Sequence, residues 1–438
     1  MKRRIASWLL TIGVLVSLSL VGTMGGAAQA ACAPIATGLV NPRFLAIADD
    51  GTVYVTEAGA GGTEPVPTPP GEGPGGPPGT RGLSGQITRI APNGAKSVLT
   101  RDLPSYFQPA EGSSGPSGIA LAGGALWVAV GGAGPGTPRV TPLPNENAVV
   151  RVNLQSGAVE RIVDIGANER ANNPDPNAVD SNLYGAAFGA DGRLYVADAG
   201  GNTLYRVDLQ TKALSVVAVF PGLPVTTEEI PPGFLPPGVP FTNPQRGGRA
   251  ELDPVPTGVT AGPDGNLYVA NLSGFPYVNG KARVLRVTPT GAVSDAATDL
   301  TMVVSVAFGP DGLLYVSQIA TGFQVTGPDS PPAISPGAIV RVRPGGAKEV
   351  VLGDLNAPSG IAFDRVGTLY VAVNAAFGQP DQGQVLRCTG VAAPGMPGLP
   401  STGAGGAQRS PVVPLALAVA ALACALALVA ARRHAARH

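Results

Sequence analysis

The body of the chain alternates short apolar segments with turn-forming residues, and one such pattern recurs six times. Each copy has a short apolar strand, a tight turn and a second apolar strand that reads LYVA or a variant. The copies read FLAIADDGTVYVTE from Phe44, GIALAGGALWVAV from Gly118, GAAFGADGRLYVAD from Gly185, GVTAGPDGNLYVAN from Gly258, SVAFGPDGLLYVSQ from Ser305 and GIAFDRVGTLYVAV from Gly360. Strands that are apolar on both faces are typical of sheets buried between neighbouring sheets.

The residues between the two strands of each copy predict hairpins. Four copies carry Asp-Gly, a pair that favours the positive φ angles of primed two-residue hairpin turns. These pairs are Asp50-Gly51, Asp191-Gly192, Asp264-Gly265 and Asp311-Gly312, and the second and sixth copies have Gly123-Gly124 and Val366-Gly367 instead.

Two further strand-like segments follow each hairpin, except in the last copy. The third segments include AVVRVN from Ala148 and AIVRVR from Ala338, and a typical fourth is KEVVLGDLN from Lys348. The sixth copy stops at Gly390, but PIATGLVNP, from Pro34, has the form of the missing strand. The pattern therefore predicts an all-β fold over residues 31–390: a six-bladed β-propeller with four-stranded blades, closed by the N-terminal strand in the last blade.

Two of the three cysteines lie at the two ends of this body. Cys32 directly precedes the N-terminal strand, and Cys388 lies in the third strand of the sixth copy. The predicted closure brings them together, so we expect a Cys32–Cys388 disulfide; two unpaired thiols are the alternative. Cys424 lies in a C-terminal apolar run, where it is expected to be an inert small residue.

The N-terminus has the features of a secretory signal peptide. Lys2, Arg3 and Arg4 precede an apolar run, and the small residues Ala28-Gln29-Ala30 end it. Residues 1–30 are therefore predicted to be removed on export, with an uncleaved anchor helix as the alternative.

The C-terminus carries a second targeting pattern. Residues 391–411 form a stalk rich in Pro and Gly, an apolar run over 412–431 is long enough to span a bilayer as a helix, and a basic tail follows at 432–438. The stalk contains Leu399, Pro400, Ser401, Thr402 and Gly403, in the order found in bacterial proteins that a sortase anchors to the cell wall. We expect display at the cell surface, with a membrane span that retains an incidental LPSTG as the alternative.

Composition excludes several kinds of chemistry. The formal net charge is zero, which argues against a nucleic-acid partner. The only two histidines, His434 and His438, lie in the basic tail. A Ser-His-Asp or Cys-His catalytic centre and a His-containing zinc site are therefore not expected in the body of the chain.

Polar residues occur where second strands end and first strands begin, positions that meet at one mouth of a propeller. They predict a site for a small ligand or protein partner that comprises Arg43, Glu57, Asn182, Tyr184, Asp198, Asn202, Asn271, Gln318 and Asn374. Oxygen ligands suit Ca²⁺, which Glu57, Asp198, Asn271 and Asn374 could hold. Alternatively, these side chains cap turns, and Val130 interrupts the polar series.

The chain resembles the ScyD/ScyE family of secreted bacterial propellers, within the NHL-like and SMP-30-like superfamily. The resemblance rests on LVNPRFLAIADDGTVYVTEAGAGG, VLTRDLPSYFQPAEGSSGPSGIAL, SNLYGAAFGADGRLYVADAGGN and VPTGVTAGPDGNLYVANLSGF. It implies the fold and export, but no catalytic residues. Two functions stay open: a surface-anchored binding or scaffold propeller without catalysis, and a Ca²⁺-dependent hydrolase or lyase of lactonase type.

Overall fold

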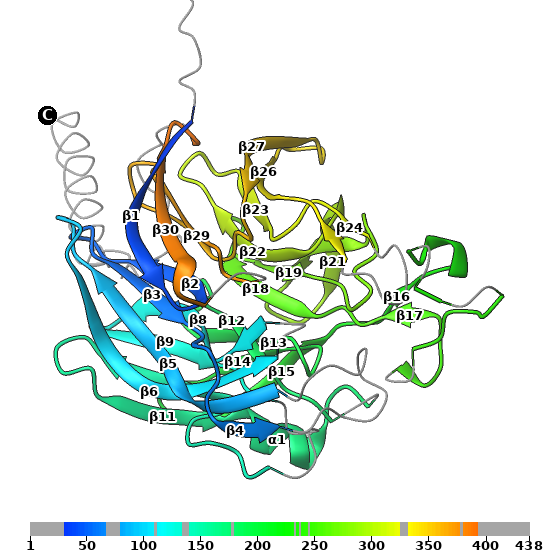
Figure 1. Ribbon diagram of the computed structural model, residues 1–438, viewed down its shortest axis with the longest axis horizontal. Helices are drawn as coiled ribbons and strands as arrows, with labels where there is room; N and C mark the ends of the chain where they lie inside the picture. The colour runs from blue at the N-terminus through cyan, green and yellow to red at the C-terminus, as the bar shows by residue number, and fades with distance from the viewer. Residues whose placement is uncertain are drawn as a thin grey trace, which may run out of the picture.

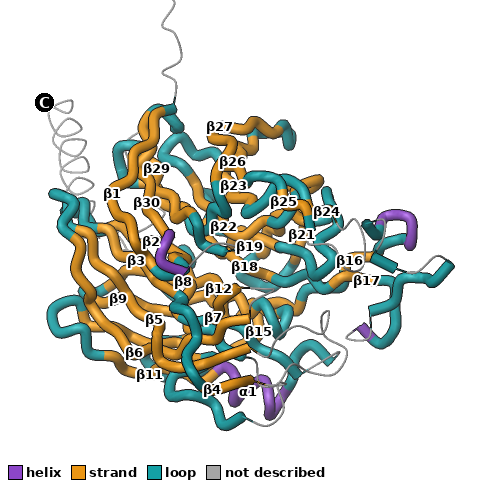
Figure 2. Tube along the Cα trace, in the orientation of Figure 1, coloured by secondary structure: helices purple, strands orange, loops and turns teal. Residues whose placement is uncertain are grey.

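The computed structural model is built almost entirely from antiparallel strands (Figures 1 and 2). It describes residues 30–66, 79–108, 112–133, 140–176, 179–231, 234–235, 238–243, 246–324, 332–376 and 380–392. The predicted signal peptide, LPSTG motif, membrane span and basic tail lie outside these residues. Within the part described, no helix is long and apolar enough to cross a membrane.

The first half of the chain forms three sheets. The first contains β2 (Pro42–Ile47), β3 (Val53–Glu57), β5 (Gly79–Ile90), β6 (Lys96–Gln108) and β7 (Gly112–Ser114), with β4 (Glu64–Val66) paired to β5. The second contains β8 (Pro116–Ala122), β9 (Ala125–Val130), β10 (Ala148–Asn153) and β11 (Val159–Asp164). The third contains β12 (Leu183–Phe188), β13 (Leu194–Asp198), β14 (Thr203–Val207) and β15 (Leu214–Val219).

The second half forms three more. The fourth sheet contains β18 (Pro256–Ala261), β19 (Leu267–Asn271), β20 (Ala282–Val287) and β21 (Val293–Leu300). The fifth contains β22 (Val303–Phe308), β23 (Leu314–Gln318), β26 (Gly337–Val342) and β27 (Lys348–Leu355). The sixth contains β28 (Ile361–Phe363), β29 (Leu369–Val373), β30 (Gly383–Thr389) and the N-terminal β1 (Ala31–Leu39).

Several short elements lie in the connections between the strands and sheets. Helix α1 (Ile165–Asn172) follows β11, and two-stranded sheets join β16 (Leu223–Pro224) to β17 (Glu251–Leu252) and β24 (Phe323–Gln324) to β25 (Ala333–Ile334). Single 3₁₀ turns occur at η1 (Thr227–Glu229) and η3 (Pro380–Gln382). The strand pattern did not predict α1, whose N-cap, Asp164, accepts a hydrogen bond from the backbone N–H of Ala167 at 2.8 Å.

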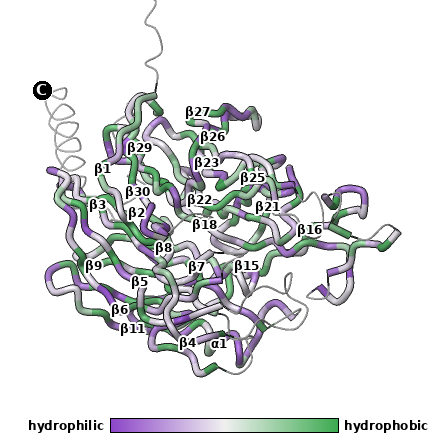
Figure 3. The backbone as a smooth tube through the Cα atoms, in the orientation of Figure 1, coloured by the Kyte–Doolittle hydropathy of each residue, from purple (hydrophilic) through white to green (hydrophobic). Residues whose placement is uncertain are grey.

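Apolar side chains on both faces of the sheets form a separate core between each pair of neighbouring sheets. In β3, Val53 and Val55 point into the core shared with the sixth sheet, whereas Tyr54 points into the core shared with the second sheet. The same alternation makes cores between every successive pair of sheets, and the sixth sheet packs on the first. Figure 3 shows hydrophobic stretches recurring along these strands. This cyclic packing of antiparallel sheets is consistent with a β-propeller.

The first strands of the sheets form the centre of this arrangement. The labels of β2, β8, β12, β18 and β22 lie near the middle of Figure 1, with β6, β11, β21 and β27 towards the outside. Neighbouring first strands approach so closely that a Cβ atom at Gly185 would lie 2.2 Å from the backbone oxygen of Thr257. A Cβ atom at Gly360 would lie 2.4 Å from the oxygen of Arg43. Glycine opens each of these repeats because a side chain there would separate the two strands.

The hairpin turns differ in part from the prediction. Gly123 and Gly124 both have positive φ and form the predicted two-residue turn, with Ala122 paired to Ala125. In the Asp50-Gly51 pair of the first sheet, only Gly51 has positive φ; its N–H donates to the oxygen of Ala48. The three other Asp-Gly copies also have positive φ at glycine alone. The prediction of primed turns at Asp-Gly was therefore wrong, since each makes a longer turn that ends in a left-handed glycine.

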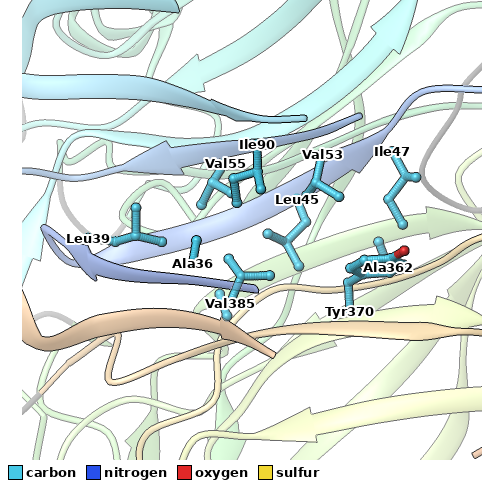
Figure 4. Packing of buried hydrophobic residues seen from close by; sticks show 11 residues of the cluster. Ala36, Leu39, Leu45, Ile47, Val53, Val55, Ile90, Ala362, Tyr370 and Val385 are labelled. Atoms are coloured by element: carbon cyan, nitrogen blue, oxygen red, sulfur yellow. The ribbon is translucent and has the colours of Figure 1, made fainter. Parts of the chain in front are cut away.

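The predicted closure by the N-terminal strand is confirmed. β1 pairs antiparallel with β30 from Ala31, opposite Thr389, to Leu39, opposite Gly383. In Figure 4, Ala36 and Leu39 of β1 lie between Val385 of the sixth sheet and the side chains of the first. Cys32 lies opposite Cys388, and the two form the predicted disulfide, with their Cα atoms 4.1 Å apart.

We expect the disulfide to contribute strongly to stability, because it connects residues 356 positions apart in the sequence. Since removal of a native disulfide typically costs about 2 to 5 kcal/mol, we expect Cys32→Ser to lower the free energy of unfolding by about that amount. Urea unfolding of the full-length protein measures this loss, with Cys424→Ser as a control that should leave stability unchanged. Two reactive thiols in the non-reduced Cys424→Ser variant would contradict the bond.

Candidate functional site

Glu57, predicted as a ligand residue, ends β3 and accepts hydrogen bonds from β5 and from the turn before β2. One carboxylate oxygen accepts a hydrogen bond from the backbone N–H of Val40 at 2.6 Å. The other accepts from the side-chain amide of Gln86 at 2.9 Å and from the hydroxyl of Thr88. The side chain is fully buried, so these donors replace the water that a carboxylate would otherwise bind.

Asp198 occupies the same position at the end of β13. Its two oxygens accept hydrogen bonds from the Ser181 hydroxyl at 2.8 Å, the Asn182 N–H at 2.8 Å and the Gly201 N–H at 3.1 Å. Burial raises the pKa of Asp198 to about 6, although these hydrogen bonds act in the opposite direction. The structure therefore brings two predicted site residues, Asp198 and Asn182, together as a structural pair.

Gln318 and Asn271 repeat the arrangement in the fifth and fourth sheets. The side-chain oxygen of Gln318 accepts from the N–H of Thr301 at 2.7 Å, and the side-chain amide of Asn271 donates to the oxygen of Pro254 at 3.1 Å. Both partners lie two residues before the first strand of the same sheet, as Val40 does for Glu57. The polar residue at the end of the second strand thus binds the chain just before the first strand.

The same position is apolar in the two remaining sheets. It is Val130 in the second sheet and Val373 in the sixth, because β29 ends at Val373. Asn374 comes one residue later and donates its amide to the oxygen of Gln382 at 2.8 Å. The prediction that Asn374 is the counterpart of Glu57 and Asp198 was therefore wrong, because the residue directly after LYVA in this copy is Val373.

These contacts bear on the predicted calcium site. Glu57, Asp198 and Asn271 end strands of three different sheets, Asn374 follows a strand of a fourth, and each side chain already has a hydrogen-bond partner in the protein. Among the described residues, no three His, Cys, Asp or Glu side chains are grouped in a way that could hold a metal ion. The capping interpretation accounts for the hydrogen bonds that these four side chains make.

Arg43 and Tyr184 form a different kind of contact at the centre of the sheets. Arg43, in β2, is 5% exposed, and its guanidinium donates to the Tyr184 hydroxyl of β12 at 3.2 Å and to the backbone oxygen of Ser113 in β7. Its Cζ atom lies 5.8 Å from the centre of the Tyr184 ring, which also packs edge-on against Phe44. Three segments distant in the sequence therefore meet at this arginine.

Partly exposed polar groups surround this contact. Asn182 donates its side-chain amide to the hydroxyl of Ser114 at 3.1 Å, and Asn41 donates to the hydroxyl of Ser113 at 2.9 Å. Tyr184, Asn182 and Ser114 are each half-buried, so solvent reaches them. We define Arg43, Ser114, Asn182 and Tyr184 as the hub cluster. Sequence reasoning identified three of its members but missed Ser114, which lies in a short segment outside the repeated pattern.

Asn202, the remaining predicted site residue, belongs to a second polar cluster. Its side-chain amide donates to Asp175 at 2.9 Å and to Asp253 at 3.4 Å. The buried Arg246 forms ion pairs with the same two carboxylates, at 2.8 and 3.4 Å. These contacts attach the insertion between the third and fourth sheets to the turn after β13. The sequence did not indicate this cluster, because its members come from two loops without a repeat.

Glu169, on α1, is a buried acid that sequence reasoning also missed. One of its oxygens accepts a hydrogen bond from Tyr205 at 3.0 Å, and the other has no partner among the described residues. Burial raises the pKa of Glu169 to about 8, and repulsion from Asp198, Asp180 and Asp175 adds to the effect. The folded protein thus favours the protonated form of this carboxyl.

The raised pKa of Glu169 makes stability depend on pH. The folded state binds this proton more tightly than the unfolded chain, so the contribution of Glu169 to stability is complete below about pH 4.5 and is lost as pH rises to about 8. In wild type, we expect the free energy of unfolding to fall by an amount on the order of a few kcal/mol across this pH window, and Glu169→Gln should abolish that fall. Urea unfolding between pH 4.5 and 8.5 measures it, with the exposed Glu160→Gln as control. Equal slopes for wild type and Glu169→Gln would contradict the expectation.

Comparisons with known proteins give limited similarity. No protein-family model matches the chain, and no curated protein matches it. A solved structure of streptogramin B lyase is 14% identical over 83% of this chain and 98% of its own, with a TM-score of 0.43. A putative oxidoreductase (glucose dehydrogenase) from Thermus thermophilus is 17% identical over 82% and 100%, with a TM-score of 0.46. The aldose sugar dehydrogenase of Streptomyces coelicolor in its PQQ-bound form is 15% identical over 82% and 98%, with a TM-score of 0.44. At these values, the fold assignment depends on the strand pairing and packing described above.

Proposed function

We propose that this chain is an exported, surface-anchored β-propeller of six blades that binds a small ligand at its centre and does not catalyse a reaction. The observation that carries the proposal is the hub cluster, where residues from three separate segments place polar groups within reach of solvent. Sites of this kind, with a few convergent polar groups on a rigid scaffold, are typical of ligand binding.

The six-bladed architecture is supported by the cyclic order of the cores. Each large sheet packs against the next in chain order, and the last packs against the first through β1 and β30. The resemblance to the ScyD/ScyE family agrees with this arrangement and with export.

The calcium-dependent hydrolase or lyase is less well supported. Glu57 and Asp198 already accept three hydrogen bonds each from strands or turns nearby, and a cation there would meet N–H and O–H donors. Histidine, the most common general base, is absent from residues 31–390.

Surface anchoring is compatible with an accessible hub. Ala31 and Thr389 are paired in neighbouring strands, so the chain begins and ends its folded body at one edge of the sixth sheet. A signal peptide before Ala31 and a stalk after Thr389 would both extend from that edge.

Elemental analysis of the purified full-length protein distinguishes the proposed binding function from the function of a calcium-dependent enzyme. We expect no stoichiometric calcium, in wild type or in Asp198→Ala. That variant should still lose about 1 to 3 kcal/mol of stability, because its buried donors lose their acceptor. Asp208→Ala, in the turn after β14, is the matched control. Stoichiometric calcium that disappears only in Asp198→Ala would favour the enzyme.

Cell fractionation tests the anchoring. If a sortase cuts between Thr402 and Gly403, Thr402→Ala should move the protein from the cell-wall digest to the membrane fraction. Ser401→Ala is the control, because the third position of the LPxTG motif is variable. Recovery of wild type and Thr402→Ala alike from the membrane would instead indicate a retained span.

A further inference from the structure

Three arginines in the described residues are buried to a similar extent, but only two of them are paired. Arg81 is 4% exposed and forms ion pairs with Glu64 and Glu146. Arg246 is 4% exposed and pairs with Asp175, Asp253 and Glu251.

Arg43 is the third of these arginines. It is 5% exposed, and no carboxylate in the described part of the chain lies within ion-pair distance of it. Its hydrogen bonds go to two neutral groups, the Tyr184 hydroxyl and the Ser113 backbone oxygen. The described part of the chain thus buries one positive charge without an anion to balance it.

Such an arrangement is unfavourable unless another molecule supplies the anion. A guanidinium removed from water loses a large hydration free energy, and buried charges are therefore normally paired. Arginine carries five N–H donors in a planar fork that matches the two oxygens of a carboxylate. Arg43 uses its fork for only two contacts, so it retains donors for a ligand.

The neighbours of Arg43 in the hub cluster also present donors. The Tyr184 oxygen accepts from Arg43, and the Ser114 oxygen accepts from Asn182, so both hydroxyl protons remain to be donated. Neither proton has an acceptor among the described residues. A guanidinium beside two hydroxyl donors complements a ligand that accepts hydrogen bonds and carries negative charge.

The charge of the cluster distinguishes between anions. The hub cluster contains one cation, Arg43, which balances one negative charge. A phosphate dianion is usually bound by more than one cation or by the N-terminus of a helix, and this cluster is built from strands. A single carboxylate is the better match.

We propose that the hub cluster binds the carboxylate group of a small molecule, with Arg43 as its counter-ion and Tyr184 and Ser114 as hydrogen-bond donors. The proposal rests on the proposed binding function and names the chemical class of the ligand. It requires neither export nor anchoring.

Titration of purified full-length protein with acetate and benzoate at constant ionic strength tests the proposal by calorimetry. We expect both to bind wild type, and inorganic phosphate to bind at least tenfold more weakly. Arg43→Gln should weaken carboxylate binding at least about tenfold, since a charged hydrogen bond of this kind contributes about 1.5 to 3 kcal/mol. Arg43→Lys should weaken it less, because the charge remains while the fork is lost. Tyr184→Phe should weaken it as well.

Two controls make the result specific. Arg365→Gln removes an exposed arginine and should leave carboxylate binding unchanged; an equal loss there would indicate a nonspecific charge effect and overturn the proposal. Glu111 lies outside the described residues but close to Ser113 in the sequence. Carboxylate binding that appears only in Glu111→Gln would mean that the chain supplies its own anion, which also overturns it.

The remaining outcomes separate this inference from the proposed function. Wild type that binds no carboxylate but binds a neutral or cationic small molecule at the hub would refute the ligand class and leave the binding function standing. Arg43→Gln that folds normally, judged by its thermal unfolding, and binds benzoate as wild type does would refute the role of Arg43. Arg43→Lys provides the same comparison if Arg43→Gln does not fold.

Discussion

The pairing of β1 with β30 is the interaction on which the rest of the structure depends. Every large sheet is apolar on both faces, so each needs a neighbour on both sides. A row of such sheets would leave two apolar faces in water at its ends. Because the first residues of the body complete the last sheet, the core formed by Ala36, Leu39 and Val385 joins the sixth sheet to the first. The hub cluster lies where β2, β7 and β12 meet, in the arrangement of sheets that this closure completes.

Much of this architecture could be predicted because its physical cause repeats in the sequence. A strand between two sheets requires apolar residues at successive positions, and close approach of the first strands requires glycine at Gly185 and Gly360. Both requirements recur in several copies and are visible without coordinates. The missing strand and the disulfide followed from completing the pattern. The turn type did not, since Asp-Gly suits two hairpin geometries, and neither did α1, which occurs once.

The candidate site was harder to predict, because a sequence repeat shows where a residue lies in a strand but not which side chains it contacts. It identified Glu57, Asp198 and Asn271 correctly as residues at strand ends, but not that their partners lie just before the first strands. These polar side chains stabilise the fold by binding the chain just before the first strands. The unusual feature of Arg43 is that it has no counter-ion among the described residues, and that depends on every residue packed around it. Glu169 is similar, since its environment comes from Tyr205 of β14, from Asp198 at the end of β13 and from the segment that follows α1.

The disulfide has a topological consequence. Residues 32–388 form a covalent circle, because the backbone and the Cys32–Cys388 bond together make a closed path. One peptide bond cut within this circle would leave a single molecule that remains connected under non-reducing conditions. The same arrangement of sheets could therefore form from a chain that begins at another point of this circle. Joining the two ends beside β1 and β30 and opening a loop elsewhere would give a circular permutant with the same sheets.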